Sequence, residues 1–339
     1  MQESHNFSRE SVNDVGFRHM LTEREVIKKM SKFVYRSVNW TPNDAVLIET
    51  GGNKFIVCQI DTLVKKTDVP PAMSLRQAGR KAAVAVVSDL ASKGVATKAL
   101  VYSISLPISY SLKDIEKIAL GLRDASIEYS FRILGADTNE ADDLVITCCA
   151  IGTSDKEIPT RSKAKPGDIV VSTGFFGLQP LGLKILLSQR KPKDEVEKRA
   201  VNTVLYPKAK LREGILTIST GAVTASMDSS DGLSCTLNDI SENSSVKIII
   251  ENLPISPGLK EKASELGLSA EDLTLNGGEE YEIIFTLDPK RAEKAFELAR
   301  KNNFRLLRIG RVEEGRGVFI SKKGRLIKVK RGGWEHFKR

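Results

Sequence analysis

Apolar runs with strand-like and helix-like periodicity alternate along the 339-residue chain, and this alternation limits the possible folds more than any other feature. Residues 22–37 and 74–94 each begin with a capping-box pattern and carry apolar side chains at helical spacing. Residues 45–49 and 54–60 are short β-rich runs separated by Gly and Asn, as in a hairpin. Alternating elements with antiparallel hairpins among them predict an α/β or α+β fold with mixed sheets.

One segment interrupts the periodic pattern near the middle of the chain. Residues 160–168 (TRSKAKPGD) are polar and basic, contain Pro and Gly, and precede a new strand pattern at residue 169. A chain of 339 residues is also long for a single hydrophobic core. We therefore predict two domains, residues 1–159 and residues 160–339.

The composition argues against a membrane or nucleic-acid partner. No run approaches the roughly 18 apolar residues that a membrane span requires. The polar start MQESHNFSRE has the features of neither a signal peptide nor a transit peptide, so we expect a cytoplasmic protein. The net charge is +9, but Lys and Arg are spread along the chain and no nucleic-acid-binding motif is present.

Several aspartates stand where apolar β-rich runs stop. Asp61, Asp137 and Asp228 each follow such a run, and Asp231 comes three residues after Asp228 at the predicted start of a helix. Carboxylates that converge on a cleft repel one another unless a cation lies between them. Magnesium suits such oxygen ligands and joins one or two carboxylates to substrate phosphates. The pattern is compatible with a magnesium–phosphate site, although a single aspartate at such a junction is more often a cap or turn residue.

The common nucleotide-binding and nucleophile motifs are missing. The sequence has neither GxxxxGK[ST] nor GxGxxG, so a nucleotide would have to bind through metal and backbone groups. It has no GxSxG motif either, and we predict no protein nucleophile among its catalytic groups.

A series of short segments gives a more specific indication. In chain order they are PNDA (42–45), DTLV (61–64), VSDLA (87–91), GADT (135–138), TRSKAKPGD (160–168), MDSSDGL (227–233), NGGEEYE (276–282), IGRV (309–312) and GWEHF (333–337). Together they resemble the motifs of the thiamine-monophosphate kinases. The fold group of that family also includes aminoimidazole ribonucleotide synthetase, selenophosphate synthetase and a hydrogenase-maturation dehydratase.

The resemblance implies a fold and a reaction. It implies a two-domain α/β protein in which residues 1–159 bind ATP and magnesium and pair with a second copy to close a β-barrel. Residues 160–339 would form an α/β sandwich that completes the nucleotide and substrate cleft. The reaction would move the γ-phosphoryl group of ATP directly onto thiamine monophosphate, with Mg²⁺ assisting and ATP as co-substrate.

The resemblance also implies roles for particular residues. Asp44, Asp61, Asp89, Asp137, Asp228 and Asp231 would bind magnesium. Ala136, Asp137, Arg161 and Ser230 would contact ATP. Asp68, Glu279 and Trp334 would contact the thiamine substrate, with Trp334 stacking on its cationic ring.

The departures from the family pattern keep two other functions open. Asn43 replaces an acidic residue, Gln59 stands where a hydroxyl residue is usual, and Asp68 stands in place of a histidine. These changes are compatible with an ATP-using paralogue that has a different acceptor. The basic composition is compatible with a non-enzymatic protein that binds nucleotide or nucleic acid.

Overall fold

The computed structural model describes residues 22–34, 43–52 and 54–334. Helix α1 (Glu23–Val34) is described by itself, and it begins with the expected capping box. The backbone N–H of Thr22 donates to Glu25 Oε2 at 2.9 Å, and that of Glu25 donates to Thr22 Oγ1 at 3.3 Å. The last residues of the helix predicted over 22–37 lie outside the described residues.

The first sheet is mixed and has the strand order β1-β2-β5-β3-β4. Its strands are β1 (Val46–Gly51), β2 (Lys54–Val64), β3 (Thr97–Leu106), β4 (Arg132–Glu140) and β5 (Val145–Ser154). The β3–β4 pair is parallel and the other pairs are antiparallel. The helices of this part of the chain are α2 (Lys65–Asp68), α3 (Leu75–Ser92) and α4 (Leu112–Glu128).

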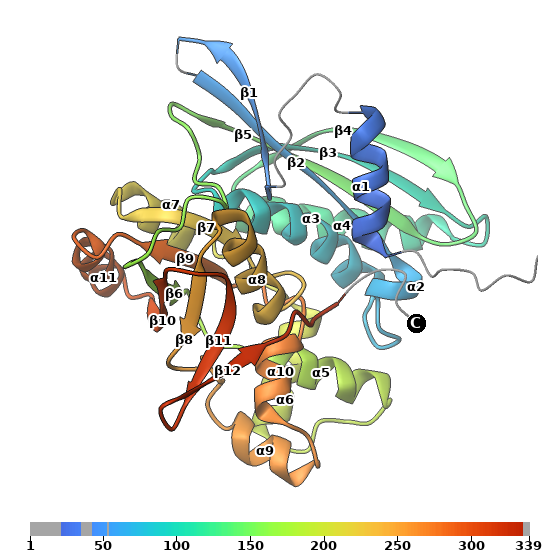
Figure 1. Ribbon diagram of the computed structural model, residues 1–339. Coiled ribbons are helices and arrows are strands. Elements are labelled where there is room, and N and C mark those ends of the chain that lie inside the picture. The colour runs from blue at the N-terminus through green and yellow to red at the C-terminus, as the bar shows by residue number, and fades with distance from the viewer. Residues whose placement is uncertain (1–21, 35–42, 53, 335–339) are drawn as a thin grey trace, which may run out of the picture. The chain divides into compact units, whose positions relative to one another are not determined.

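Helices α3 and α4 pack against one face of this sheet (Figure 1). Val57, Leu100 and Ile146 project from the sheet into the same core as Val86 and Ile118 of the two helices. Apolar residues recur on one face of each element with the period of its secondary structure, and their burial is the main force that holds the layers together.

The other face of the first sheet presents apolar side chains to solvent. Val46, Ile48 and Ile60 alternate with buried Val57 along the paired strands β1 and β2, so they lie on the opposite face. Ile60 is 62% exposed and Ile48 is 52% exposed. Contiguous exposed apolar residues are characteristic of interaction surfaces.

The second sheet is also mixed, and its strand order is β12-β11-β8-β10-β6-β9-β7. Its strands are β6 (Ile169–Ser172), β7 (Val223–Asp228), β8 (Lys247–Ile250), β9 (Ile283–Leu287), β10 (Leu307–Glu313), β11 (Gly317–Lys322) and β12 (Arg325–Val329). The helices are α5 (Leu178–Leu187), α6 (Glu195–Leu205), α7 (Leu211–Ser219), α8 (Leu233–Ser244), α9 (Leu259–Glu265), α10 (Ala270–Asn276) and α11 (Ala292–Lys301).

Side chains from helices cover both faces of the second sheet. Leu237 of α8 shares a core cluster with Ile248 and Ile284 on one face. Ala295 of α11 packs with Phe285 on the other face. Helix α3 also reaches this second cluster, because its residue Ala91 belongs to it. The expected α/β architecture with two mixed sheets is confirmed.

Two details of the first sheet differ from the expectation. Strand β2 continues three residues beyond Asp61, and β4 continues beyond Asp137, so neither aspartate ends its strand. The reason is pairing, because β2 matches β5 as far as Val64 and β4 matches β3 as far as Glu140. The described part of the single chain contains an open sheet and no closed barrel.

Candidate functional site

Three aspartates, one each from a helix, a strand and a loop, come together between the two halves of residues 42–334. Asp89 lies near the C-terminal end of α3, Asp228 ends β7, and Asp44 precedes β1. Burial and the charges of Asp228 and Asp61 raise the pKa of Asp89 well above its ordinary value. Burial and the charge of Asp44 raise the pKa of Asp228 to about 7, although a hydrogen bond from Ser88 opposes this shift. The carboxylates are therefore close enough to repel one another.

Asp44 differs from its neighbours because protein cations compensate its charge. Lys93 Nζ lies 2.6 Å from Asp44 Oδ2, and the Arg161 guanidinium pairs with Asp44 Oδ1. Ser92 Oγ donates a further hydrogen bond to Oδ2 at 3.2 Å. Burial raises the pKa of Asp44, but Lys93 and Arg161 outweigh burial and hold the pKa below its ordinary value.

The sheet register separates Asp61 from Asp137. Asp61 pairs with Cys148, Cys148 with Tyr102, and Tyr102 with Ala136, so these residues form one row across four strands. Paired residues share a face, and buried Cys148 marks this face as the one that α3 and α4 cover. Asp137 follows Ala136 directly and therefore lies on the opposite face, where Asn139 Nδ2 donates to it at 2.9 Å.

This register has a consequence for the predicted ligand set. The structure brings Asp44, Asp89 and Asp228 together with Asp61 near them. Within one chain it does not bring Ala136 or Asp137 to these four, because two strands lie between β2 and β4.

The loop after β7 carries Ser230 and Asp231 and contacts two other predicted residues. The backbone N–H of Glu279 donates to Ser230 O at 2.5 Å, and that of Trp334 donates to Asp231 O at 3.0 Å. Trp334 is 51% exposed. The N-cap of α8 is Gly232 at φ 113° rather than Asp231, so the ordinary cap role does not explain this aspartate. The structure thus gathers Ser230, Asp231, Glu279 and Trp334 at one place.

Buried Lys81 connects two of the three residues predicted to contact the acceptor, Asp68 and Glu279. Lys81 Nζ lies 2.5 Å from Glu279 Oε1 and 2.6 Å from the carbonyl oxygen of Asp68. Gln179 Nε2 donates to the other oxygen of Glu279 at 2.7 Å. The Asp68 carboxylate itself accepts a hydrogen bond from the Val64 N–H at 2.6 Å. Asp68 and Glu279 therefore belong to one hydrogen-bonded group.

The sequence interpretation missed three residues of this region: Lys81, Lys93 and Tyr281. Tyr281 is buried at φ 52°, and burial followed by the charge of Glu279 raises its pKa well above the ordinary value. The charges of Asp61 and Asp228 raise this pKa further, so the phenol lies within the electrostatic influence of both the aspartates and Glu279. Helical periodicity could have identified the two lysines, because Lys81 stands among the apolar positions of α3 and Lys93 directly precedes the glycine that stops this helix.

The aspartates suit a magnesium ion that is bound jointly by protein carboxylates, water and substrate phosphates. Among the described residues, no three His, Cys, Asp or Glu side chains are arranged so that they could hold a metal ion by themselves. Magnesium does not require such a cage, because it usually keeps water ligands and joins one or two carboxylates to substrate phosphates. Asp89, Asp228 and Asp61 repel one another, and a cation bound between them would reduce this repulsion.

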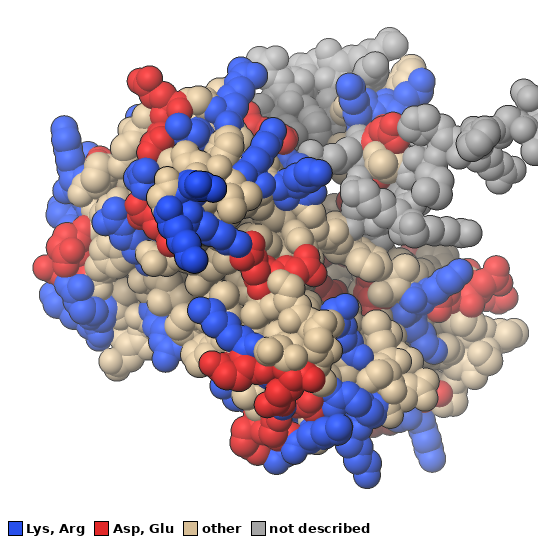
Figure 2. Space-filling view, turned by 60° about the horizontal axis from the view of Figure 1, so that its bottom comes forward, with Lys and Arg blue, Asp and Glu red and all other residues tan. Residues whose placement is uncertain are grey.

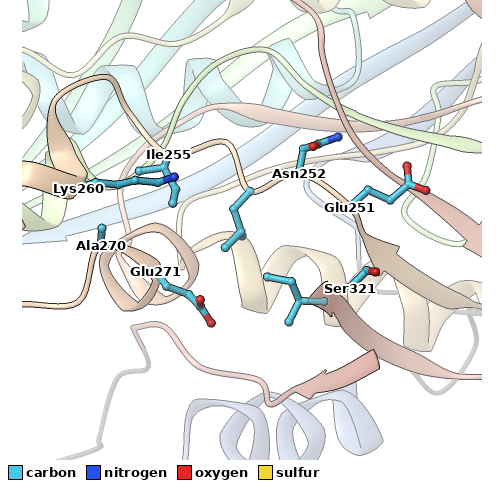
Figure 3. A pocket seen from close by; sticks show the side chains of 9 residues that line it. Glu251, Asn252, Ile255, Lys260, Ala270, Glu271 and Ser321 are labelled. Carbon is cyan, nitrogen blue, oxygen red and sulfur yellow. The ribbon is translucent and has the colours of Figure 1, made fainter. Parts of the chain in front are cut away.

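A separate pocket of about 480 Å³ lies beside β11 and contains none of these residues (Figure 3). Its two acidic side chains have partners, since Glu251 pairs with Arg311 and Glu271 with Lys322.

Figure 2 shows Lys and Arg side chains interspersed with Asp and Glu on the visible face of the molecule. In the described part of the chain no helix is long and apolar enough to cross a membrane.

Comparison with known families gives matches in both halves of the chain. Residues 42–154 match the AIR synthase related protein, N-terminal domain, and residues 165–323 match the corresponding C-terminal domain. The thiamine-monophosphate kinase of Nitrosopumilus maritimus is 36% identical over 318 residues, which cover 94% of this chain and 99% of the relative. That of Pyrococcus abyssi is 35% identical and covers 93% of this chain and 96% of the relative.

Solved structures show the same relationship. The structure of AaThiL complexed with AMPPCP and TMP superposes with a TM-score of 0.82 at 27% identity, and covers 93% of this chain and 97% of the other. A HypE–HypF complex at 20% identity and a TM-score of 0.74 shares the fold. Both sequence and structure agree over nearly the full length, and the chain belongs to the thiamine-monophosphate kinase family.

Proposed function

We propose that this protein transfers the γ-phosphoryl group of ATP to the phosphate of thiamine monophosphate. A phosphate oxygen of the acceptor forms a bond to the γ-phosphorus as the bond from that phosphorus to the β,γ-bridging oxygen breaks. The products are thiamine diphosphate and ADP. The acceptor phosphate is already ionised, so no protein nucleophile or general base is needed.

The observation that carries this proposal is the convergence of aspartates from helix α3, strand β2 and strand β7 in a member of this family. Asp89, Asp228 and Asp61 are the residues that would hold magnesium. Magnesium bound there would offset the repulsion between the two phosphate groups. The chain itself fixes the positions of the carboxylates, because α3 carries Asp89 and β7 carries Asp228.

The remaining predicted contacts form the rest of the proposed site. Ser230 and Arg161 would contact the nucleotide, and Glu279 and Trp334 would contact the thiamine moiety. Asp231, Asp68, Ala136 and Asp137 keep the roles that the resemblance implies as predictions. We also keep the domain boundary at residues 159 and 160 and the cytoplasmic location as predictions.

A homodimer is part of the proposal. Val46, Ile48 and Ile60 lie on one exposed face of the first sheet, and Asp137 lies on the same face. Pairing of two such faces would remove these apolar side chains from water. It would also place Asp137 inside the assembly, which could bring it to a site that it does not reach within one chain.

A coupled assay of product formation tests the activity. Purified protein with ATP, Mg²⁺ and thiamine monophosphate should yield thiamine diphosphate and ADP in equal amounts. Asp228→Asn should lower kcat at least about 100-fold, because charge neutralisation at the transferring phosphoryl group is lost. Asp155→Asn, at an exposed position, is the control and should leave kcat unchanged.

Two outcomes would contradict the proposal. Absence of product from folded wild-type protein would reject the reaction. ATP consumption with another acceptor but not with thiamine monophosphate would instead identify a paralogue with a changed acceptor site, which the engaged carboxylate of Asp68 makes worth testing.

A further inference from the structure

Lys93 is a completely buried lysine at the centre of the aspartate group. It follows α3 as its C-terminal cap residue, and its side chain has an exposure of 0%. Burial lowers the pKa of Lys93, and the charge of Asp44 opposes this shift. A buried ammonium group is strongly unfavourable unless it is paired and hydrogen-bonded, so its partners show what it does.

The partners of Lys93 come from three separate parts of the chain. Its Nζ lies 2.6 Å from Asp44 Oδ2 in the segment before β1. The same nitrogen donates to the carbonyl oxygen of Ser226 in β7 at 2.8 Å. Lys93 thus joins the end of α3 to a loop of the first half and to a strand of the second sheet.

These contacts occupy Asp44. One carboxylate oxygen accepts from Lys93 and Ser92, and the other pairs with Arg161. Asp89 and Asp228 differ, because among the described residues neither forms an ion pair with a lysine or arginine. The site therefore contains one carboxylate neutralised by the protein and two that are not.

The contacts also fix the positions of the other two aspartates. Asp89 stands one helical turn before Lys93 on α3. Asp228 stands two residues after Ser226 on β7 and projects from the same face of the strand. The hydrogen bond from Lys93 to Ser226 therefore fastens together the two elements that carry Asp89 and Asp228.

We propose that Lys93 is a positioning residue that supplies a fixed positive charge to Asp44, so that Asp44 is an anchor of the site and not a magnesium ligand in this chain. This inference rests on the proposed magnesium-assisted transfer. It implies that the divalent cation is held on the side of Asp89, Asp228 and Asp61, while a protein ammonium group occupies the side of Asp44.

Binding of Mn²⁺ tests the proposal without turnover. Mn²⁺ prefers the same oxygen ligands as Mg²⁺, and the electron paramagnetic resonance signal of unbound Mn²⁺ reports how much is bound. Lys93→Met removes the charge at similar length and leaves Asp44 Oδ2 without its cation. We expect this variant to bind Mn²⁺ at least about tenfold more tightly than the wild type, because it gains a carboxylate ligand.

Three further variants decide what causes such a gain. Adding Asp44→Asn to Lys93→Met should remove the gain, whereas Lys93→Arg, which keeps the charge, should bind Mn²⁺ like the wild type. Lys98→Met, at an exposed position of β3, is the matched control and should leave Mn²⁺ affinity unchanged. Equal Mn²⁺ affinity in wild type and Lys93→Met, or a gain that persists in the double variant, would overturn the proposal.

A second comparison applies even if Lys93→Met does not fold. In the wild-type background, Asp228→Asn should weaken Mn²⁺ binding about tenfold or more, whereas Asp44→Asn should change it less than about threefold. A loss with Asp44→Asn as large as that with Asp228→Asn would show that Asp44 is a ligand and would reject the proposal. The reaction itself is judged only from product formation by the wild type, so the two proposals fail by different measurements.

Discussion

The buried charges of this protein differ in how their neighbours compensate them. Lys93 and Asp44 form an ion pair, and Lys81 is paired with Glu279. Glu280 forms no ion pair with a cation among the described residues, and the nearby Lys210 pairs with Glu282 instead. Instead, Glu280 accepts a hydrogen bond from the backbone N–H of Gly177 at 2.5 Å. Burial raises the pKa of Glu280 to about 8, and this residue therefore binds a proton more readily in the folded protein than in the unfolded chain.

This shift predicts a pH dependence of stability. A carboxyl group with a raised pKa contributes stability that is fully present below its ordinary value of 4.5 and is lost as the pH rises through about 8. Glu280→Gln keeps the acceptor oxygen but cannot ionise. We expect the melting temperature of this variant to fall less than that of the wild type between pH 5 and pH 9 in thermal unfolding experiments.

The control for this experiment is Glu261→Gln on the exposed side of α9. Its melting curve should follow that of the wild type at every pH. Parallel pH profiles of wild type and Glu280→Gln would show that Glu280 does not titrate in the way its burial predicts.

At the scale of elements, the helices α3 and α4 approach each other closely through glycine. A Cβ atom on Gly121 of α4 would lie 1.9 Å from the carbonyl oxygen of Arg76, and one on Gly79 of α3 would lie 2.3 Å from that of Ile118. Both obstacles are backbone atoms, which cannot move as a flexible side chain can. The close approach therefore requires glycine on both sides.

Gly121→Ala should consequently destabilise the protein, although alanine is the better helix former. We expect the free energy of unfolding to fall by about 1–3 kcal/mol, as is typical when a packed core must accommodate extra volume. Denaturation by urea measures this quantity. Glu116→Ala, at an exposed position of the same helix, should change it by less than about 0.5 kcal/mol, and an equal effect of both substitutions would argue against the clash.

Much of the element pattern could be predicted from the sequence, and the failures have physical causes. The capping box at Ser74 and Gln77 correctly marked the start of α3, because local hydrogen bonds determine such a boundary. Helix α7 (Leu211–Ser219) was not predicted, and Gly214 interrupts its helical pattern. A Cβ atom on Gly214 would lie 2.0 Å from the carbonyl oxygen of Ala91, so tertiary contact with α3, which periodicity cannot reveal, explains this glycine.

The candidate site could also be predicted only in part, because tertiary contacts decide which of its residues meet. Motif order identified the aspartates, but sheet register decides which of them meet, and it separates Asp137 from Asp61. The cations that compensate Asp44 come from residues 93 and 161, which are distant from it in the sequence. Only the folded chain shows this compensation.

At the scale of the whole molecule, the exposed face of the first sheet predicts self-association. Ile60→Asp places a charge among the exposed apolar side chains of this face, and burial of that charge in an interface would be unfavourable. We expect the wild type to be a dimer and Ile60→Asp to be a monomer by light scattering after gel filtration. The exposed isoleucine of α4, in Ile127→Asp, is the control.

A wild-type monomer at micromolar concentration would contradict the proposed dimer. A variant that remains dimeric would show that a different face mediates association. Activity of the monomeric variant would add information on Asp137, because the proposed pairing of sheets is what would bring this residue to the site.

The packing of helix α3 also affects how the two halves of residues 42–334 can move. Its residue Ala91 is packed in a core cluster of the second sheet, and Ala78 shares another with Leu186 and Val204 of α5 and α6. A hinge opening at residues 160–168 would pull both alanines out of apolar surroundings at the same time. The two halves are therefore expected to move as one rigid body, so substrate entry and product exit should not require them to separate.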